Sequence, residues 1–266
     1  MDKIFTISSH YQLLNMLLKS SLLNLTIICA SLFSFSSFAD IANKKDLKGT
    51  VHQRVLIVVS SDRHGYWLPE VVEPYQLLQQ AGFAIDIASP LGGEGKASGV
   101  FRLSAEQKNW LKHSELTKKL SNSKKIKQVD ARNYQAVYFA GGSGPMFDFI
   151  NNLAIQKLTA SIYQNGGIVS ADCHGIAALL NVKLATGSRL IAGKNITAKA
   201  NHEEGHWARK NYPFLLEDKI SQLGGNYQSA PKGKAHVVVD DRLITGQNPA
   251  SAIPMTKQLI NALLQL

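Results

Sequence analysis

Cysteine is scarce in this chain of 266 residues, which contains only Cys29 and Cys173. The run SSLLNLTIICASLFSFSSFAD follows Lys19, and its apolar core and small-residue end are typical of a secretory signal cleaved after Ala39. Cleavage would remove Cys29, so the mature chain would hold one thiol and no internal disulfide. A lone thiol in an oxidising compartment is a liability unless it is buried or used.

We therefore expect residues 1–39 to be a signal peptide and residues 40–266 to form a single exported, periplasmic domain. The alternative is that the apolar segment is retained as a membrane anchor. Its short apolar core and its small-residue end favour cleavage. After cleavage, no contact with a membrane is expected.

Acidic residues are outnumbered: 19 Asp and Glu stand against 29 Lys and Arg, for a formal net charge of +10. Much of the excess lies between Lys108 and Lys127, without aromatic residues interleaved in the way that favours nucleic-acid binding. Such a charge run is usually a solvated face, and we expect that here rather than a nucleic-acid or anionic surface.

A tight metal-ligand pattern is also missing. His64, His202 and His206 are not arranged with carboxylates at the close spacing typical of a metal site, so no metal site is predicted. Internal repeats are absent, and so are low-complexity tracts outside the signal-like segment.

The chain does contain, from Arg54 onward, short β-branched runs that alternate with longer helical stretches. This pattern is typical of parallel strands joined by crossover helices and predicts an α/β fold: a flavodoxin-like, doubly wound, mostly parallel sheet with helices on both faces. Strands are expected at residues 54–61, 83–90, 134–142 and 166–172, and helices at 70–82, 152–164 and 249–266. Between the last strand and the closing helix come two further segments, 190–200 and 235–246. The Lys-rich segment 94–132 has no strand signal and is expected as a helical or irregular insertion at the rim of the sheet.

The stretch IVSADCHGIAALL places Cys173 where a strand must turn sharply into a helix. A nucleophile on such an elbow is held above the sheet edge, with the following backbone N–H groups directed at the atom it attacks. The helix N-terminus favours a thiolate and predicts a lowered pKa for Cys173. The alternative is a buried structural cysteine. His174 supports a catalytic role only because of the sharp turn, since the next residue in a straight strand would face away from Cys173.

Two further segments follow predicted strands. Glu70 begins a helix, and the loop AGGSGPMFDF places Gly142, Ser143 and Gly144 where their backbone N–H groups could hold an oxyanion. The alternatives are a carboxylate that only complements the helix dipole and a glycine turn that only makes a tight connection.

These segments resemble a known family. The motifs GYWLPEVVEPYQLLQQAGFAIDIASPLGG, GGSGPMFDF, SADCHG, ITAKANHEE and RLITGQNPASA have the order and spacing of the ThiJ/PfpI superfamily, within the class I glutamine amidotransferase-like fold. The resemblance runs from about Arg54 to the C-terminus. It is greatest to the branch of glutathione-independent glyoxalases and heat-shock chaperones, and it implies a homodimer.

The resemblance also implies a site and an activity. Cys173 matches the nucleophile, His174 the histidine beside it, Glu70 the acid that hydrogen-bonds the thiol, and Glu204 the acid that orients the histidine. A slip of one residue would put Glu203 in the place of Glu204. The implied reaction converts methylglyoxal or glyoxal to lactate or glycolate through a cysteine hemithioacetal, without a metal or organic cofactor.

Four positions depart from the family pattern. Ser143 replaces a histidine, Asp172 an apolar residue, Ile176 a proline and Lys199 an aromatic residue. Asp172 would raise the pKa of Cys173 if its carboxylate pointed toward the thiol, whereas strand alternation would aim it to the opposite side.

Three other functions stay open at this point. A stress-related holdase would act through exposed apolar surface rather than through the cysteine. A peptidase or amidase would use the same Cys-His pair on another substrate. A peroxide sensor without a resolving cysteine would be oxidised to sulfinic acid.

Overall fold

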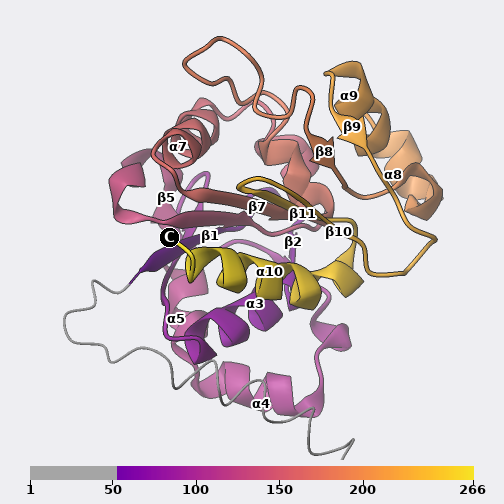
Figure 1. Cartoon of the computed structure of the whole chain (residues 1–266). Helices are drawn as coiled ribbons and strands as arrows, with labels where there is room; N and C mark the ends of the chain where they lie inside the picture. The colour runs from indigo at the N-terminus through magenta and orange to yellow at the C-terminus, as the bar shows by residue number, and fades with distance from the viewer. Residues whose placement is uncertain (1–52) are drawn as a thin grey trace, which may run out of the picture. The chain divides into compact units, whose positions relative to one another are not determined.

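A seven-stranded sheet forms the centre of the computed structural model, which describes residues 53–266 (Figure 1). Its strand order is β10-β11-β7-β6-β1-β3-β5, and within it β10 and β11 pair antiparallel while the other neighbours pair parallel. The predicted α/β fold is therefore confirmed, whereas the predicted signal segment lies outside the described residues. The strands are β1 (Arg54–Val58), β3 (Ala84–Ser89), β5 (Lys124–Lys125), β6 (Ala136–Phe139), β7 (Ile168–Asp172), β10 (Val237–Asp240) and β11 (Leu243–Gly246).

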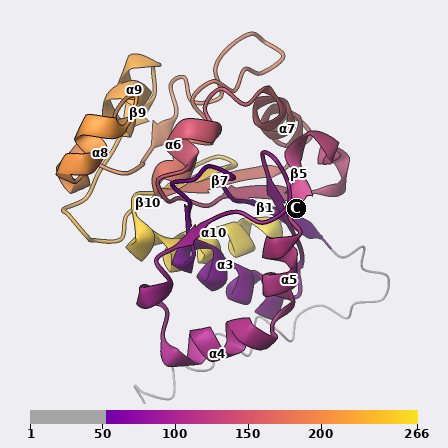
Figure 2. The same cartoon turned by 180° about the vertical axis from the view of Figure 1, so that it is seen from behind.

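Strand alternation divides the core into two layers. In β1, Leu56 and Val58 pack on the side of α7, whereas Val55 and Ile57 pack on the side of α3 and α10. Both views show α7 on one side of the sheet and α3 with α10 on the other (Figures 1 and 2). Because both faces are covered, this strand is a continuous apolar run in the sequence. The helices are α3 (Pro69–Gln80), α7 (Leu153–Gln164) and α10 (Ala252–Leu263).

The ends of α3 follow from its sequence. Pro69 occupies the first turn, where its missing N–H costs no hydrogen bond. Gly82 has φ +86° just beyond the C-terminal end, a left-handed conformation that stops the helix. The predicted helix at residues 70–82 is thus confirmed, with both ends shifted by one or two residues.

The Lys-rich segment is mostly helical, with α4 (Ala105–His113) and α5 (Glu115–Ser121). The prediction that it contains no strand is wrong, because β5 pairs with β3 and extends the sheet, and β4 (Ala97–Ser98) pairs with β2 (Tyr66–Trp67). Each of these strands has two residues, too few to produce a β pattern in the sequence.

The segment at residues 190–200 contributes only β8 (Asn195–Ile196), which pairs with β9 (Asn226–Tyr227) in a separate small sheet. Among the described residues, no helix is both long and apolar enough to cross a membrane. The remaining helices are α6 (Pro145–Asp148), α8 (His206–Asn211) and α9 (Leu216–Gln222), with 3-10 turns η1 (Val100–Arg102), η2 (Ile126–Gln128), η3 (Ala131–Asn133), η4 (Cys173–Ala178), η5 (Asn201–Glu203) and η6 (Pro249–Ser251).

Candidate active site

Cys173 lies at a strained corner between β7 and η4. Its φ is +55°, in the left-handed region that residues with a side chain rarely adopt. Such a conformation costs on the order of 1–3 kcal/mol and persists only where the surrounding structure enforces it. The predicted elbow is confirmed, although a six-residue 3-10 turn follows the strand instead of an α-helix.

The corner brings three of the predicted site residues into one chain of contacts. The Sγ of Cys173 lies 3.5 Å from Nδ1 of His174, and Nε2 of His174 lies 2.8 Å from Oε1 of Glu204. All three side chains are buried. This arrangement provides a nucleophile, a base and a group that orients the base.

Glu203 points elsewhere. Its Oε1 accepts hydrogen bonds from the Gly233 backbone N–H at 2.7 Å and from Nδ2 of Asn248 at 3.0 Å. Its Oε2 lies 3.5 Å from the ammonium of Lys199. The ambiguity left by the sequence is therefore resolved in favour of Glu204 as the carboxylate that contacts His174.

Glu70, in the first turn of α3, is fully buried beside the cysteine. A Cβ atom added to Gly141 would overlap the Glu70 carboxylate and lie 2.8 Å from the Cβ of Cys173, so glycine is required between them. Burial raises the pKa of Glu70 to about 8. The Gly141 N–H and the Cys173 thiol oppose this rise, without full hydrogen-bond geometry. Glu70 is thus mostly protonated at neutral pH.

The electrostatics of Cys173 differ from the sequence prediction. Burial raises the pKa of its thiol well above the ordinary value, Glu70 adds to the rise, and Lys199 opposes it. The predicted lowering is wrong because the thiol is almost inaccessible to water and because η4 is too short to supply a strong dipole. Cys173 is therefore a neutral thiol at rest, and it must lose its proton, with His174 in reach, as it attacks.

Asp172 lies on the side of the sheet that faces α3 and α10. Its Oδ1 would lie 2.6 Å from a Cβ added to Gly246, the neighbouring residue on β11. Burial, followed by the charge of Glu70, raises the pKa of Asp172 well above its ordinary value. Asp172 also raises the pKa of Cys173, but less than Glu70 does.

The predicted oxyanion loop needs one correction. The N–H of Gly144 donates to the carbonyl of Gly65 at 2.7 Å and is not free for a ligand. The N–H groups of Gly142 and Ser143 have no acceptor within residues 53–266. Gly142 has φ +108° and packs against the backbone of Trp67, so the loop can approach β2 only with glycine at this position.

An aromatic cluster next to His174 was missed by the sequence reasoning. It consists of His64, Phe147, Trp207 and Tyr212, whose ring centroids lie between 4.3 and 5.9 Å apart in the contacting pairs. The Tyr212 ring lies edge-on to His174 at 5.1 Å. The four residues come from three distant segments, so no local sequence motif predicts the cluster.

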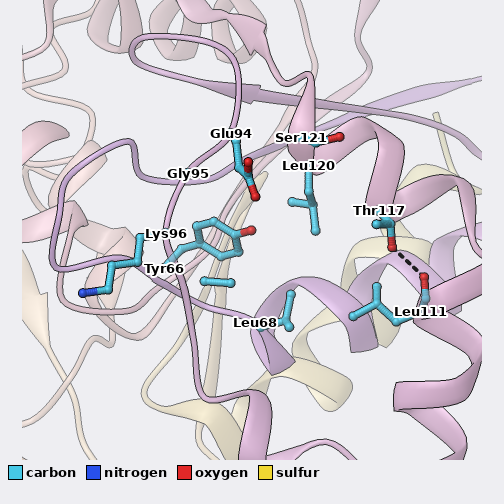
Figure 3. A pocket seen from close by; sticks show the side chains of 10 residues that line it. Tyr66, Leu68, Glu94, Gly95, Lys96, Leu111, Thr117, Leu120 and Ser121 are labelled. Atoms are coloured by element: carbon cyan, nitrogen blue, oxygen red, sulfur yellow. Dashed lines mark hydrogen bonds between the residues drawn. The ribbon is translucent and has the colours of Figure 1, made fainter.

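A separate cavity of about 540 Å³ lies beside β2 and α5 (Figure 3). The hydroxyl of Tyr66 points into it beside Glu94 and Leu120, and burial together with Glu94 raises the pKa of Tyr66 to about 12. None of the predicted site residues lines this cavity. In the described part of the chain, no group of three or more His, Cys, Asp or Glu could hold a metal ion.

Sequence comparison finds relatives that are named as glyoxalases. Glyoxalase 3 of Candida albicans is 30% identical over 210 residues, which cover 74% of this chain and 89% of the relative. The glutathione-independent glyoxalase HSP31 of Saccharomyces cerevisiae is 31% identical over 238 residues, covering 84% and 99%.

Solved structures show the same fold. Rapid Encystment Protein 24 KDa of Francisella tularensis superposes with a TM-score of 0.76 at 35% identity, covering 79% of this chain and 99% of that one. Glyoxalase III of Candida albicans gives a TM-score of 0.74 at 28% identity, covering 80% and 98%. Residues 53–262 match the DJ-1/PfpI family. The chain therefore belongs to the DJ-1/PfpI family, near its glyoxalase branch.

Proposed function

We propose that this chain is a glutathione-independent glyoxalase that converts methylglyoxal or glyoxal to lactate or glycolate. The contact chain from Cys173 through His174 to Glu204 carries the proposal, because it joins a nucleophile to an oriented base. The relatives named as glyoxalases, one of them as a glutathione-independent glyoxalase, support the choice of substrate.

The reaction begins when the sulfur of Cys173 bonds to the aldehyde carbon of R–CO–CHO and the thiol proton passes to Nδ1 of His174. A proton returned to the aldehyde oxygen completes the hemithioacetal R–CO–CH(OH)–S. His174 removes the proton from the sulfur-bearing carbon, which gives an enediol. Protonation of the adjacent carbon then converts the enediol to the thioester R–CHOH–CO–S. Water then cleaves the thioester to R–CHOH–COOH and restores the thiol, so the net change is the addition of one water molecule.

Other residues of the site assist this reaction. Glu204 holds the proton of His174 on Nε2 and stabilises the imidazolium that forms. Glu70, being protonated, adds no negative charge beside the sulfur when the thiolate develops. The N–H groups of Gly142 and Ser143 supply donors for the oxygen that gains negative charge.

The test is the formation of lactate from methylglyoxal without glutathione, comparing the wild type with Cys173→Ala. We expect turnover in the wild type and none in the variant, with the same circular dichroism spectrum for both. Equal inactivity of both proteins overturns the proposal and directs the search to amide substrates of the same Cys-His pair. Suppression of aggregation that persists in Cys173→Ala would indicate a holdase instead.

We also propose that the chain is exported to the periplasm after cleavage behind Ala39, and that it acts as a homodimer. The apolar segment with its small-residue end supports export. Edman sequencing of the protein from a periplasmic extract tests the cleavage site, and light scattering of the purified protein tests the dimer. A mature chain that still begins at Met1, or a monomeric mass, overturns the respective statement.

A further inference from the structure

Four aromatic rings form a connected set that reaches His174 through Tyr212. Phe147 stacks on His64 with ring centroids 4.3 Å apart. Tyr212 lies 5.9 Å from Phe147 and 5.7 Å from Trp207. The four rings come from the loop between β1 and β2, from α6, and from α8 with the residue after it. They form one connected aromatic cluster.

Polar contacts hold two of these rings in place. The hydroxyl of Tyr212 donates to Oγ of Ser143 at 2.8 Å, which ties the ring to the glycine-rich loop of the site. Nδ1 of His64 lies 2.6 Å from Oδ1 of Asp62. The cluster is therefore preorganised, and a ligand that contacts it has little ordering to induce.

The cluster connects the surface to the catalytic histidine. At its outer end, Trp207 is 48% exposed and Phe147 is 36% exposed. At its inner end, the ring of Tyr212 lies edge-on to His174 at 5.1 Å. Cys173 itself is only 4% exposed, so a substrate must reach it past neighbouring side chains. Exposed aromatic surface that continues into a site is a typical feature of ligand recognition.

We propose that the cluster of His64, Phe147, Trp207 and Tyr212 is a subsite for the substituent R of the dicarbonyl R–CO–CHO, and that it favours an aryl group. The inference rests on the proposed glyoxalase function and names its substrate class. The aldehyde carbon bonds to Cys173, and R extends along the rings toward the solvent. The bonds made and broken are the same for every R, so the rings affect only binding of the substituent. Aromatic pairing favours an aryl R over the methyl of methylglyoxal.

The test compares kcat/KM for phenylglyoxal and for methylglyoxal, with formation of mandelate and lactate as the readouts. We expect the wild type to prefer phenylglyoxal, and we expect Trp207→Ala to reduce this preference by about three- to tenfold. Phe147→Ala should act in the same direction. Leu153→Ala is the matched control, because Leu153 is an exposed apolar residue at the start of α7 and makes none of these ring contacts.

A second measurement separates this inference from the function on which it rests. Binding of mandelate and of lactate, measured by calorimetry, needs no turnover. Tighter binding of mandelate that is lost in Trp207→Ala supports the subsite even if neither dicarbonyl is consumed, in which case only the glyoxalase function fails. Turnover of both substrates with a ratio that Trp207→Ala leaves unchanged overturns the subsite while the function stands.

Discussion

Nε2 of His174 lies 2.8 Å from Oε1 of Glu204, and both side chains are shielded from water. A carboxylate is only an acceptor, so the imidazole proton is placed on Nε2 by this contact. Nδ1 then has a free lone pair 3.5 Å from the sulfur of Cys173. The pair of His174 and Glu204 thus selects the tautomer that can accept the thiol proton.

Replacing Glu204 with glutamine should lower kcat for methylglyoxal by about a hundred- to ten-thousandfold. The amide keeps the size of the side chain but carries no charge to stabilise the imidazolium of His174. Stopped-time lactate assays at saturating substrate measure the effect. Glu203→Gln is the matched control, because Glu203 makes no contact with His174; it contacts Gly233 and Asn248 and lies 3.5 Å from the ammonium of Lys199. A larger loss in the control than in Glu204→Gln contradicts the assignment.

Glu70 should give the rate a dependence on pH. Burial raises the pKa of Glu70 to about 8, so the group is neutral below this pH and charged above it. The charge that forms above about pH 8 raises the pKa of Cys173 further and disfavours the developing thiolate. We therefore expect kcat/KM to fall as the pH rises through about 8.

Glu70→Gln removes the ionisation while keeping the shape of the side chain. The alkaline fall in kcat/KM should disappear in this variant, whatever its rate at pH 7. A fall with an unchanged midpoint in Glu70→Gln would show that another group titrates.

Lys199 should make the buried thiol more reactive. Its charge lowers the pKa of Cys173 against the effects of burial and of Glu70. In Lys199→Met, alkylation of Cys173 by iodoacetamide should be about fivefold slower at pH 8, as mass spectrometry of the Cys173 peptide would show. Lys194→Met is the control, because Lys194 pairs with Asp240 at 2.6 Å instead. Equal rates in wild type and Lys199→Met would rule out this electrostatic role.

The sequence was sufficient to predict the parallel sheet and the elbow at Cys173, because each rests on a local pattern. The β-branched strand before Cys173 and the small residues after it are contiguous, so their periodicity indicates the turn. Glu204 lies 30 residues from His174. The family resemblance pointed to Glu204 as the partner of His174, and only the structure distinguishes it from Glu203 in that role.

The sequence failed where the answer depends on distant segments. The pKa of Cys173 is raised because the fold buries the thiol and because α3 places beside it Glu70, whose charge adds to the rise above about pH 8. The lowering expected from the helix N-terminus takes neither burial nor Glu70 into account. The N–H of Gly144 is similarly unavailable because the loop before β2 brings the carbonyl of Gly65 to it.

Asp172 gives a last prediction, on stability. Burial and the charge of Glu70 raise its pKa well above the ordinary value in the folded chain. The folded state therefore keeps a proton that the unfolded chain releases near pH 4. The stabilising contribution of this proton is complete below that pH and is lost as the pH rises toward the folded pKa, by up to about 1.4 kcal/mol per pH unit.

Asp172→Asn removes this titration, and both carboxylate oxygens lack a hydrogen-bond partner in the described part of the chain. The free energy of unfolding, measured with urea, should be similar in variant and wild type at pH 4 and clearly higher in the variant at pH 8. Asp240→Asn should instead be less stable than the wild type at pH 8. A hydrogen bond from Lys194 lowers the pKa of Asp240, so its charged form stabilises the fold. If Asp172→Asn is instead the less stable protein at pH 8, the carboxylate is favourable where it lies, and burial does not raise its pKa in the folded chain.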